Sequence, residues 1–241
     1  MRSLKTFGLF ALSLSIAFAQ SPPNAADILK KVGETYKSAT QYEFIANITV
    51  QGVASHMLFA FKAPDHYRME GNFPGLGYGE AVIVDDGSAV WLYAPKTNQY
   101  GSFVASQLTA DAPGDLGDLR PEALDYFMMT LFRDASNLAK DAKVLREESI
   151  TVAGIKTGCF VVATSPSSND ASGSFTLWVD KKTYHVLRED SGGTSMVFTT
   201  IKLGERLPDD LFKFVPPAGA NKVEMHVEPR RIPPPPPPPP K

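Results

Sequence analysis

Cysteine and histidine are scarce in this chain. Its 241 residues include one cysteine, Cys159, and four histidines. One cysteine cannot form an internal disulfide, and His56, His66, His185 and His226 lack the spacing of metal ligands. We therefore expect no disulfide within the chain and no metal site. Cys159 lies in a strand-like run, which predicts a small buried hydrophobe rather than a nucleophile.

Familiar catalytic motifs are missing as well. Residues 192–196, Gly-Gly-Thr-Ser-Met, only superficially resemble the glycine-flanked serine of a hydrolase. Adjacent acids on a strand point to opposite faces, and adjacent acids in a turn are solvated, so neighbouring pairs do not make an acid/base site. Three such pairs occur: Asp85-Asp86, Glu147-Glu148 and Asp209-Asp210. We expect no catalytic residue, no cofactor and no enzymatic activity.

A strong excess of positive charge is also absent. The formal net charge is −2, with 24 Lys and Arg against 26 Asp and Glu. Nucleic-acid phosphates are bound by clustered Lys and Arg, so we expect no nucleic-acid partner. Beyond the N-terminal region no apolar run has the length that a membrane span requires, so we do not expect a membrane-spanning protein.

The N-terminus has the pattern of an export signal. Two basic residues near the start are followed by an apolar stretch over residues 7–18, which ends in Ala-Phe-Ala. This pattern predicts a signal peptide over residues 1–19, cleaved before Gln20, and a mature protein in the periplasm. An uncleaved anchor is the alternative that this stretch leaves open.

The chain does contain many short runs in which apolar and polar residues alternate. Residues 41–50 show this period of two, and similar runs recur as far as residue 203. Asp85-Asp86-Gly87 between two such runs predicts a tight hairpin. An amphipathic helix is predicted over residues 25–38, with Asn24 as its N-cap. The pattern indicates an α+β protein, with an antiparallel sheet and helices against one face.

Two further segments have uses that the residues leave open. Pro121 is well placed to begin a second helix, whose apolar stripe includes Phe127, Met128 and Leu131. Its methionines suit a surface that repacks around ligands, although a helix that plugs a core would show the same stripe. Residues 228–241 form a proline-rich tail, predicted to adopt polyproline II. This tail is a docking ligand, a spacer or a solvated end.

Four passages of the sequence, in order, resemble the LolA family of periplasmic carriers for outer-membrane lipoproteins. They are Ala26-Asp27-Ile28-Leu29, Phe61 to Glu70 (FKAPDHYRME), Val84 to Tyr93 (VDDGSAVWLY) and Leu207 to Gly219 (LPDDLFKFVPPAG). The resemblance implies one lipid- or lipoprotein-binding domain over residues 20–227. It also implies a curved, incompletely closed antiparallel β-barrel, a half-barrel whose open side is covered by helices, with an apolar cavity between.

The resemblance implies a function too. A protein of this family binds the acyl chains of lipoproteins or lipids and moves them from the inner to the outer membrane. Its partners are an inner-membrane ABC transporter and an outer-membrane receptor, and it acts as a monomer. The alternative is an envelope sensor or protein-interaction module with the same fold, which uses the polyproline tail for docking.

Candidate ligand contacts follow from the resemblance and, for the second helix, from helical spacing. Each of them is also a candidate for plain core packing. Relatives often have Arg before the proline of the strand–Pro–strand passage, where it helps to hold the helical lid shut. Here that position is Ala63, and alternation points the neighbouring Lys62 to the opposite face. The candidates are Phe44, Phe59, Phe61, Tyr67, Met69, Ile83, Phe127, Met128 and Leu131.

Overall fold

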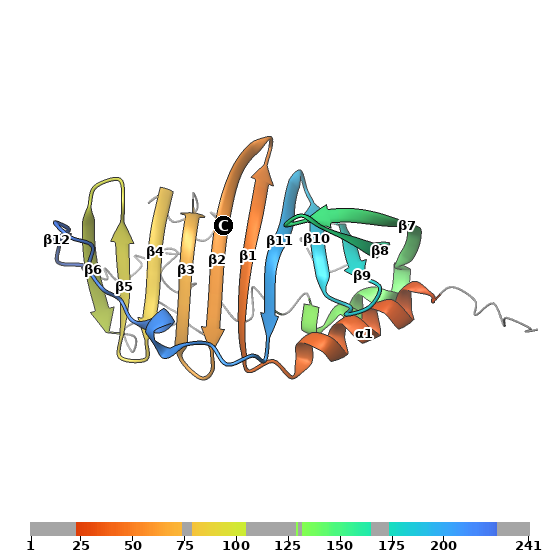
Figure 1. Cartoon of the computed structure of the whole chain (residues 1–241), viewed down its shortest axis with the longest axis horizontal. Coiled ribbons are helices and arrows are strands. Elements are labelled where there is room, and N and C mark those ends of the chain that lie inside the picture. The colour runs from red at the N-terminus through yellow and green to blue at the C-terminus, as the bar shows by residue number, and fades with distance from the viewer. Residues whose placement is uncertain (1–22, 74–78, 105–128, 130–131, 165–173, 226–241) are drawn as a thin grey trace, which may run out of the picture.

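The computed structural model describes residues 23–73, 79–104, 129, 132–164 and 174–225. There, twelve strands form one open, curved sheet in the order β12-β6-β5-β4-β3-β2-β1-β11-β10-β9-β8-β7 (Figure 1). Neighbouring strands are antiparallel, except that β12 and β6 are parallel. The strands are β1 (Gln41–Val50), β2 (Val53–Lys62), β3 (His66–Phe73), β4 (Gly79–Asp86), β5 (Ala89–Ala94), β6 (Gln99–Val104), β7 (Lys143–Val152), β8 (Ile155–Thr164), β9 (Phe175–Asp180), β10 (Val186–Ser191), β11 (Thr194–Leu203) and β12 (Asn221–Lys222).

The sheet consists of two meanders that meet at its centre. Strands β1 to β6 are neighbours in space as in sequence, and so are β7 to β11. We call these meanders the first half and the second half. They are joined by β1 and β11, which pair from Tyr42 opposite Leu203 to Val50 opposite Thr194. The predicted hairpin around Asp86-Gly87 is confirmed, since it connects β4 to β5.

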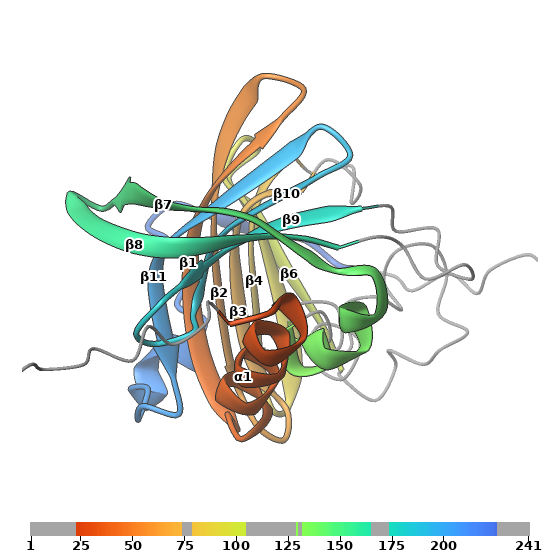
Figure 2. The same ribbon diagram turned by 90° about the vertical axis from the view of Figure 1, so that its right-hand side faces the viewer.

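Helix α1 (Ala25–Lys37) lies against one face of the sheet (Figure 2). Asn24 caps it with a side-chain hydrogen bond to the backbone, as predicted. The ring of Tyr36 lies 6.3 Å from that of Phe44 on β1. Its hydroxyl accepts a hydrogen bond from the backbone N–H of Val186 on β10, at 3.0 Å. One side chain of α1 therefore contacts both halves of the sheet.

A second helical segment packs against α1. It includes the buried side chains of Met129 and Phe132 and the 3₁₀ helix η4 (Ala135–Asp141). A Cβ atom at Gly33 of α1 would lie 3.0 Å from the backbone oxygen of Arg133. Only a glycine at this position lets the two segments approach so closely.

The sheet has an inner face, against which α1 lies, and an opposite outer face. Residues 204–225, here called the strap, leave β11 and cross the outer face along the lower ends of the strands in Figure 1. Within the strap, the 3₁₀ helix η5 (Asp209–Phe212) buries Phe212 against Ala60 of β2. The ring of Phe214 stacks on that of Trp91, at 5.3 Å between centroids. The strap ends beside β6, where it forms β12.

The structure confirms the predicted curved antiparallel sheet with helices, but the sheet is open and does not form a barrel. The two edge strands of the sheet are β12 and β7, and they do not pair with each other. Among the described residues, no helix combines the length and the apolar character needed to cross a membrane.

Candidate ligand-binding site

The inner face of the first half carries rows of large apolar side chains. Strand register places Tyr42, Phe61 and Tyr67 opposite one another in one row. Each of these side chains, and each of those in the next row, is at most 7% exposed. They share a face because successive residues of a strand point to opposite sides. The next row contains Phe44, Phe59, Met69, Ile83 and Leu92.

Six of the nine candidate ligand contacts belong to these rows. Register places all six on one face of the sheet, and all six are buried together in the main core. Whether any of them touches a ligand stays a prediction. Phe127, Met128 and Leu131 lie outside the described residues. The six on the inner face are Phe44, Phe59, Phe61, Tyr67, Met69 and Ile83.

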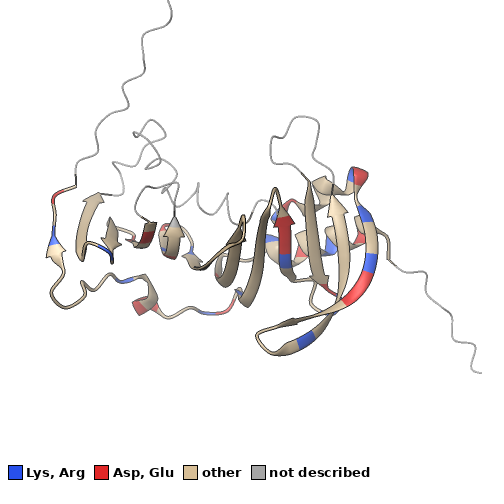
Figure 3. Ribbon diagram, turned by 90° about the horizontal axis from the view of Figure 1, so that it is seen from above, with Lys and Arg blue, Asp and Glu red and all other residues tan. Residues whose placement is uncertain are grey.

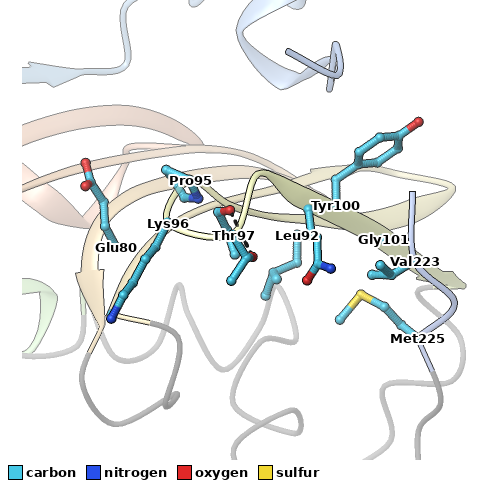
Figure 4. Close-up of a pocket in the computed structure, with 12 residues that line it drawn as sticks. Glu80, Leu92, Pro95, Lys96, Thr97, Tyr100, Gly101, Val223 and Met225 are labelled. Atoms are coloured by element: carbon cyan, nitrogen blue, oxygen red, sulfur yellow. Dashed lines mark hydrogen bonds between the residues drawn. The ribbon is translucent and has the colours of Figure 1, made fainter. Parts of the chain in front are cut away.

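A hollow of about 970 Å³ opens at the edge of the first half, beside the second row (Figure 4). Its described lining comes from β4, β5, β6, the β5–β6 turn and the end of the strap. Leu92, Val223 and Met225 supply apolar wall, and Glu80 and Lys96 bring charges to it. None of the nine predicted contacts is among the described lining residues. Sequence reasoning therefore found the apolar rows and missed the hollow next to them.

Gly101 lies at the inner side of this hollow. Register places it opposite Leu92, so it continues the second row without a side chain. Met225 fills that place, since a Cβ atom on Gly101 would lie 2.6 Å from its Sδ and closer still to its Cγ. Glycine within a strand often marks such a close approach of another segment. This glycine was the signal in the sequence that could have indicated the site.

Asp85 is buried on the inner face, which corrects the expectation that the Asp85-Asp86 pair is solvated. It follows Ile83 by two residues and lies opposite Tyr67, so alternation places it among the aromatic rows. Its exposure is 0%. Its Oδ1 accepts a hydrogen bond from the N–H of Gly87 at 2.8 Å, and Oδ2 has no partner among the described residues. Burial raises the pKa of Asp85 to about 6.

Asp86, the next residue, has the opposite environment. Its Oδ1 accepts hydrogen bonds from the backbone N–H groups of Ser88 and Ala89, both at 2.9 Å. Its Oδ2 accepts one from the indole N–H of Trp91 at 3.0 Å. Partial burial works against ionisation, but these hydrogen bonds outweigh it and lower the pKa of Asp86 to about 2. The turn therefore keeps Asp86 charged down to about pH 2, whereas Asp85 already takes up its proton near pH 6.

A second inner-face carboxylate lies in the second half. Glu189 pairs with Leu177 on β9 and with Met196 on β11, and both of these side chains belong to the main core. Burial, and then the charge of Asp190, raise the pKa of Glu189 to about 7. Each half of the sheet thus carries one acid with a raised pKa on an otherwise apolar face.

Charged residues on the outer face are paired locally. Lys62 lies there, as alternation predicted, and its Nζ is 2.6 Å from Oδ1 of Asp209 in the strap. Ala63 has no side chain that could replace the lid-holding Arg of LolA relatives. In the second half, Arg188 forms an ion pair with Asp190 at 2.7 Å. Figure 3 shows acidic and basic residues mixed along the coloured part of the chain.

The remaining candidates for chemistry are few. Cys159 is buried on β8, as predicted, and burial raises the pKa of its thiol to about 11. Within the described ranges, no group of three or more His, Cys, Asp and Glu side chains is placed to hold a metal ion. The site is therefore described by its apolar rows, its hollow and two inner-face acids.

Comparison with known proteins gives distant relatives. An uncharacterized protein of Methanocaldococcus jannaschii, MJ0687, is 25% identical over 205 residues, which are 82% of this chain and 53% of that protein. The chain thus spans about half the length of this curated relative. Lipoprotein LppX of Mycobacterium tuberculosis is similar in structure, with a TM-score of 0.47, 14% identity and coverage of 77% of this chain and 98% of LppX.

A LolA superfamily protein of Nitrosomonas europaea, NE2245, is also similar, with a TM-score of 0.29, 15% identity and coverage of 80% of this chain and 99% of that one. Likenesses this distant say nothing of what the chain binds. A family model described as predicted periplasmic protein (DUF2092) matches residues 25–226. This description agrees with the location predicted from the N-terminal residues. The chain belongs to the DUF2092 family of periplasmic proteins.

Proposed function

We propose that the protein binds an amphiphile through its acyl chains, at the inner face of the first half and in the adjoining hollow. The main support for this proposal is that the apolar inner face and the hollow are continuous with each other. Leu92 ends the second apolar row and also lines the hollow, so an apolar chain that enters there meets apolar surface. A volume of about 970 Å³ is at the upper end of the usual range for ligand pockets.

The lining of the hollow suits a ligand with two different ends. Leu92 on β5 offers an apolar wall, whereas Lys96, Glu80 and Gln99 are exposed polar residues. An acyl chain gains about 0.8 kcal/mol for each CH₂ group removed from water. A polar head group would stay at the solvated rim. This division favours a lipid or an acylated protein as ligand.

In the periplasm such binding serves transport. The protein takes lipoproteins or lipids from the inner membrane and delivers them to the outer membrane, shielding their acyl chains on the way. The inner-membrane ABC transporter and the outer-membrane receptor implied by the LolA resemblance are then its partners. In this proposal α1 and the segment around Met129 cover the open side, and Phe127, Met128 and Leu131 face the ligand.

Native mass spectrometry of the mature protein, purified from its own periplasm, tests this proposal. We expect co-purifying lipid or acylated protein. Gly101→Phe places a ring where Met225 lies and should remove that ligand. The matched control is Val53→Phe, which adds the same ring at a position that is 70% exposed and far from the hollow. Circular dichroism verifies that both variants fold.

A wild-type protein that purifies empty and takes up no fluorescent fatty acid would contradict the proposal. Loss of the ligand from both variants alike would also count against the hollow, because Val53 does not line it.

A protein-binding role is the second candidate, and the position of β12 favours it. The strap brings the chain to the edge of the sheet at Met225, just before the proline-rich tail of residues 228–241. Polyproline segments dock in aromatic-lined grooves of other proteins. If this role holds, deletion of residues 228–241 abolishes partner capture in a periplasmic pull-down and leaves fatty-acid binding unchanged.

A further inference from the structure

Met225 is held in the hollow by a short and exposed piece of chain. Strand β12 has two residues, both exposed, and pairs only with β6. Besides the pairing of β12 itself, Asn221 N–H donates to Asn98 O at 2.9 Å, Val223 N–H donates to Tyr100 O at 2.8 Å, and the side-chain amide of Asn98 donates to Gly219 O at 2.9 Å. Little structure has to be undone to release this end of the strap.

The strap before β12 is anchored much more firmly. The side chains of Leu207 and Phe212 are no more than 2% exposed, and the ring of Phe214 stacks on Trp91. Gly219, between these anchors and β12, has a φ of +76°, a conformation that suits glycine. These anchors would hold the rest of the strap in place if residues 220–225 left the edge of β6.

The place on Gly101 that Met225 occupies, here called its seat, is shaped for a thin, flexible apolar group. Gly101 supplies no side chain, and Leu92 lies opposite it on β5. The unbranched thioether of Met225 lies against Gly101, packs on the main core and is only partly buried. An unbranched acyl chain has nearly the same width and flexibility as this side chain.

We propose that Met225 is a built-in occupant of the hollow, and that the end of an unbranched acyl chain takes its seat on Gly101 when ligand binds. This inference rests on the proposed function and adds a condition to it. Binding of the chain and pairing of β12 with β6 exclude each other. The free protein therefore covers its own binding site, and loading releases residues 220–225.

A reversible lock on β12 tests this exclusion in the full mature chain. Gln99 and Asn221 are paired residues of neighbouring strands, at a spacing that a disulfide can bridge. In the Gln99→Cys/Asn221→Cys variant we expect the oxidised protein to bind 11-(dansylamino)undecanoic acid at least tenfold more weakly than the same protein after reduction. Cys159 is buried and does not compete for the new thiols. The control, Val50→Cys/Val53→Cys, joins paired residues remote from the hollow and should bind alike in both states.

Met225→Ala gives the complementary measurement. Removal of the occupant should tighten probe binding, by roughly tenfold if the seated state is about 90% populated. In methyl NMR of ¹³C-methionine-labelled protein, the signal that Met225→Ala removes should shift when the probe is added to the wild type.

The outcomes separate the two proposals. If the wild type binds the probe but the lock, Met225→Ala and the NMR signal show no effect, this inference is wrong and the proposed function stands. If the wild type binds no acyl probe at all, the proposed function is wrong and this inference with it.

Discussion

The two halves of the sheet share a fold but differ in what their faces contact. In the second half, α1 sits on the inner face, and the hydroxyl of Tyr36 bonds directly to the backbone of β10. The inner face of the first half is lined by aromatic rows, and at its edge it opens into a hollow that the end of the strap closes with Met225.

The outer faces of the two halves also differ in what covers them. The first half is covered there by the strap, whose Phe212 and Phe214 pack against β2 and β5. The second half has a small outer cluster around Cys159 and Trp178, bordered by ion pairs such as Arg188–Asp190. The strap holds the first half from outside, while α1 contacts the second half from inside. The proposed ligand would lie at the inner side of the first half, next to the hollow.

The largest effect is expected from truncating a central core side chain in each half. Phe59→Ala and Leu177→Ala should each lower the free energy of unfolding by about 2–5 kcal/mol, because both side chains are fully buried. Only Phe59→Ala should also weaken binding of a fluorescent fatty acid, because it changes the surface proposed to hold the chain. Urea unfolding and a binding titration measure the two effects. Equal loss of binding in both variants would remove the functional distinction between the halves.

Asp85 should make stability depend on pH. Its pKa is raised to about 6 in the folded protein, so the unfolded chain loses its proton first, and stability falls as the pH rises from about 4 to 6. The expected loss is about 3 kcal/mol. Asp85→Asn cannot ionise, so it should lack this loss and become more stable relative to the wild type at pH 7. Urea unfolding at pH 4, 5, 6 and 7 tests this.

Asp86→Asn is the matched control in the same turn. The pKa of Asp86 is lowered to about 2, so its contribution to stability is present above pH 4 and is lost as the pH falls towards 2. This variant should therefore be less stable than the wild type at pH 7, the reverse of Asp85→Asn. Changes of the same sign in both variants would show that the two carboxylates do not differ in environment.

Glu189 offers the equivalent test in the second half. Its pKa is raised to about 7, so the free energy of unfolding should fall as the pH rises from about 4.5 to 7. Glu189 is only partly buried, and we expect about 1–2 kcal/mol after solvent screening. Thermal unfolding of Glu189→Gln across this pH range measures the effect. A profile that matches the wild type would mean that Glu189 is solvated in solution.

The smallest effect is expected on the outer face. Lys62 and Asp209 join β2 to the strap, but their side chains are 36% and 63% exposed. Lys62→Met should cost less than about 1 kcal/mol. It should leave fatty-acid binding unchanged, because Lys62 points away from the inner face. A large loss of binding would show that the strap, and not the inner face alone, controls the site.

Local patterns predicted most of the fold. Period-two alternation located the strands, Asn24 marked the start of α1, and Asp86-Gly87 marked a hairpin. These features depend on neighbours in sequence. Alternation also indicates that Asp85 shares a face with Ile83. The general rule that acids in turns are solvated led to the wrong prediction for Asp85.

The hollow could not be predicted in this way. It lies where Met225 returns to Gly101, a contact between residues far apart in the chain, and where β12 pairs with the edge of β6. The sequence pattern around residue 225 does not indicate which strand the end of the strap contacts. The isolated Gly101 within a strand was the only local sign of a close approach at this place.

The seam between β1 and β11 bears on the order in which the molecule can be assembled. Tyr42 pairs with Leu203, and Val50 pairs with Thr194. The first half is therefore synthesised long before the central edge of β1 can be paired. Until residues 194–203 arrive, β1 pairs with β2 on one side only, and its other edge is a template for aggregation. When the chain emerges N-terminus first, the central seam can form only after β11 has appeared, and the strap and β12 follow it. We therefore expect an exported chain with this order of strands to need protection until residues 194–203 have crossed the membrane.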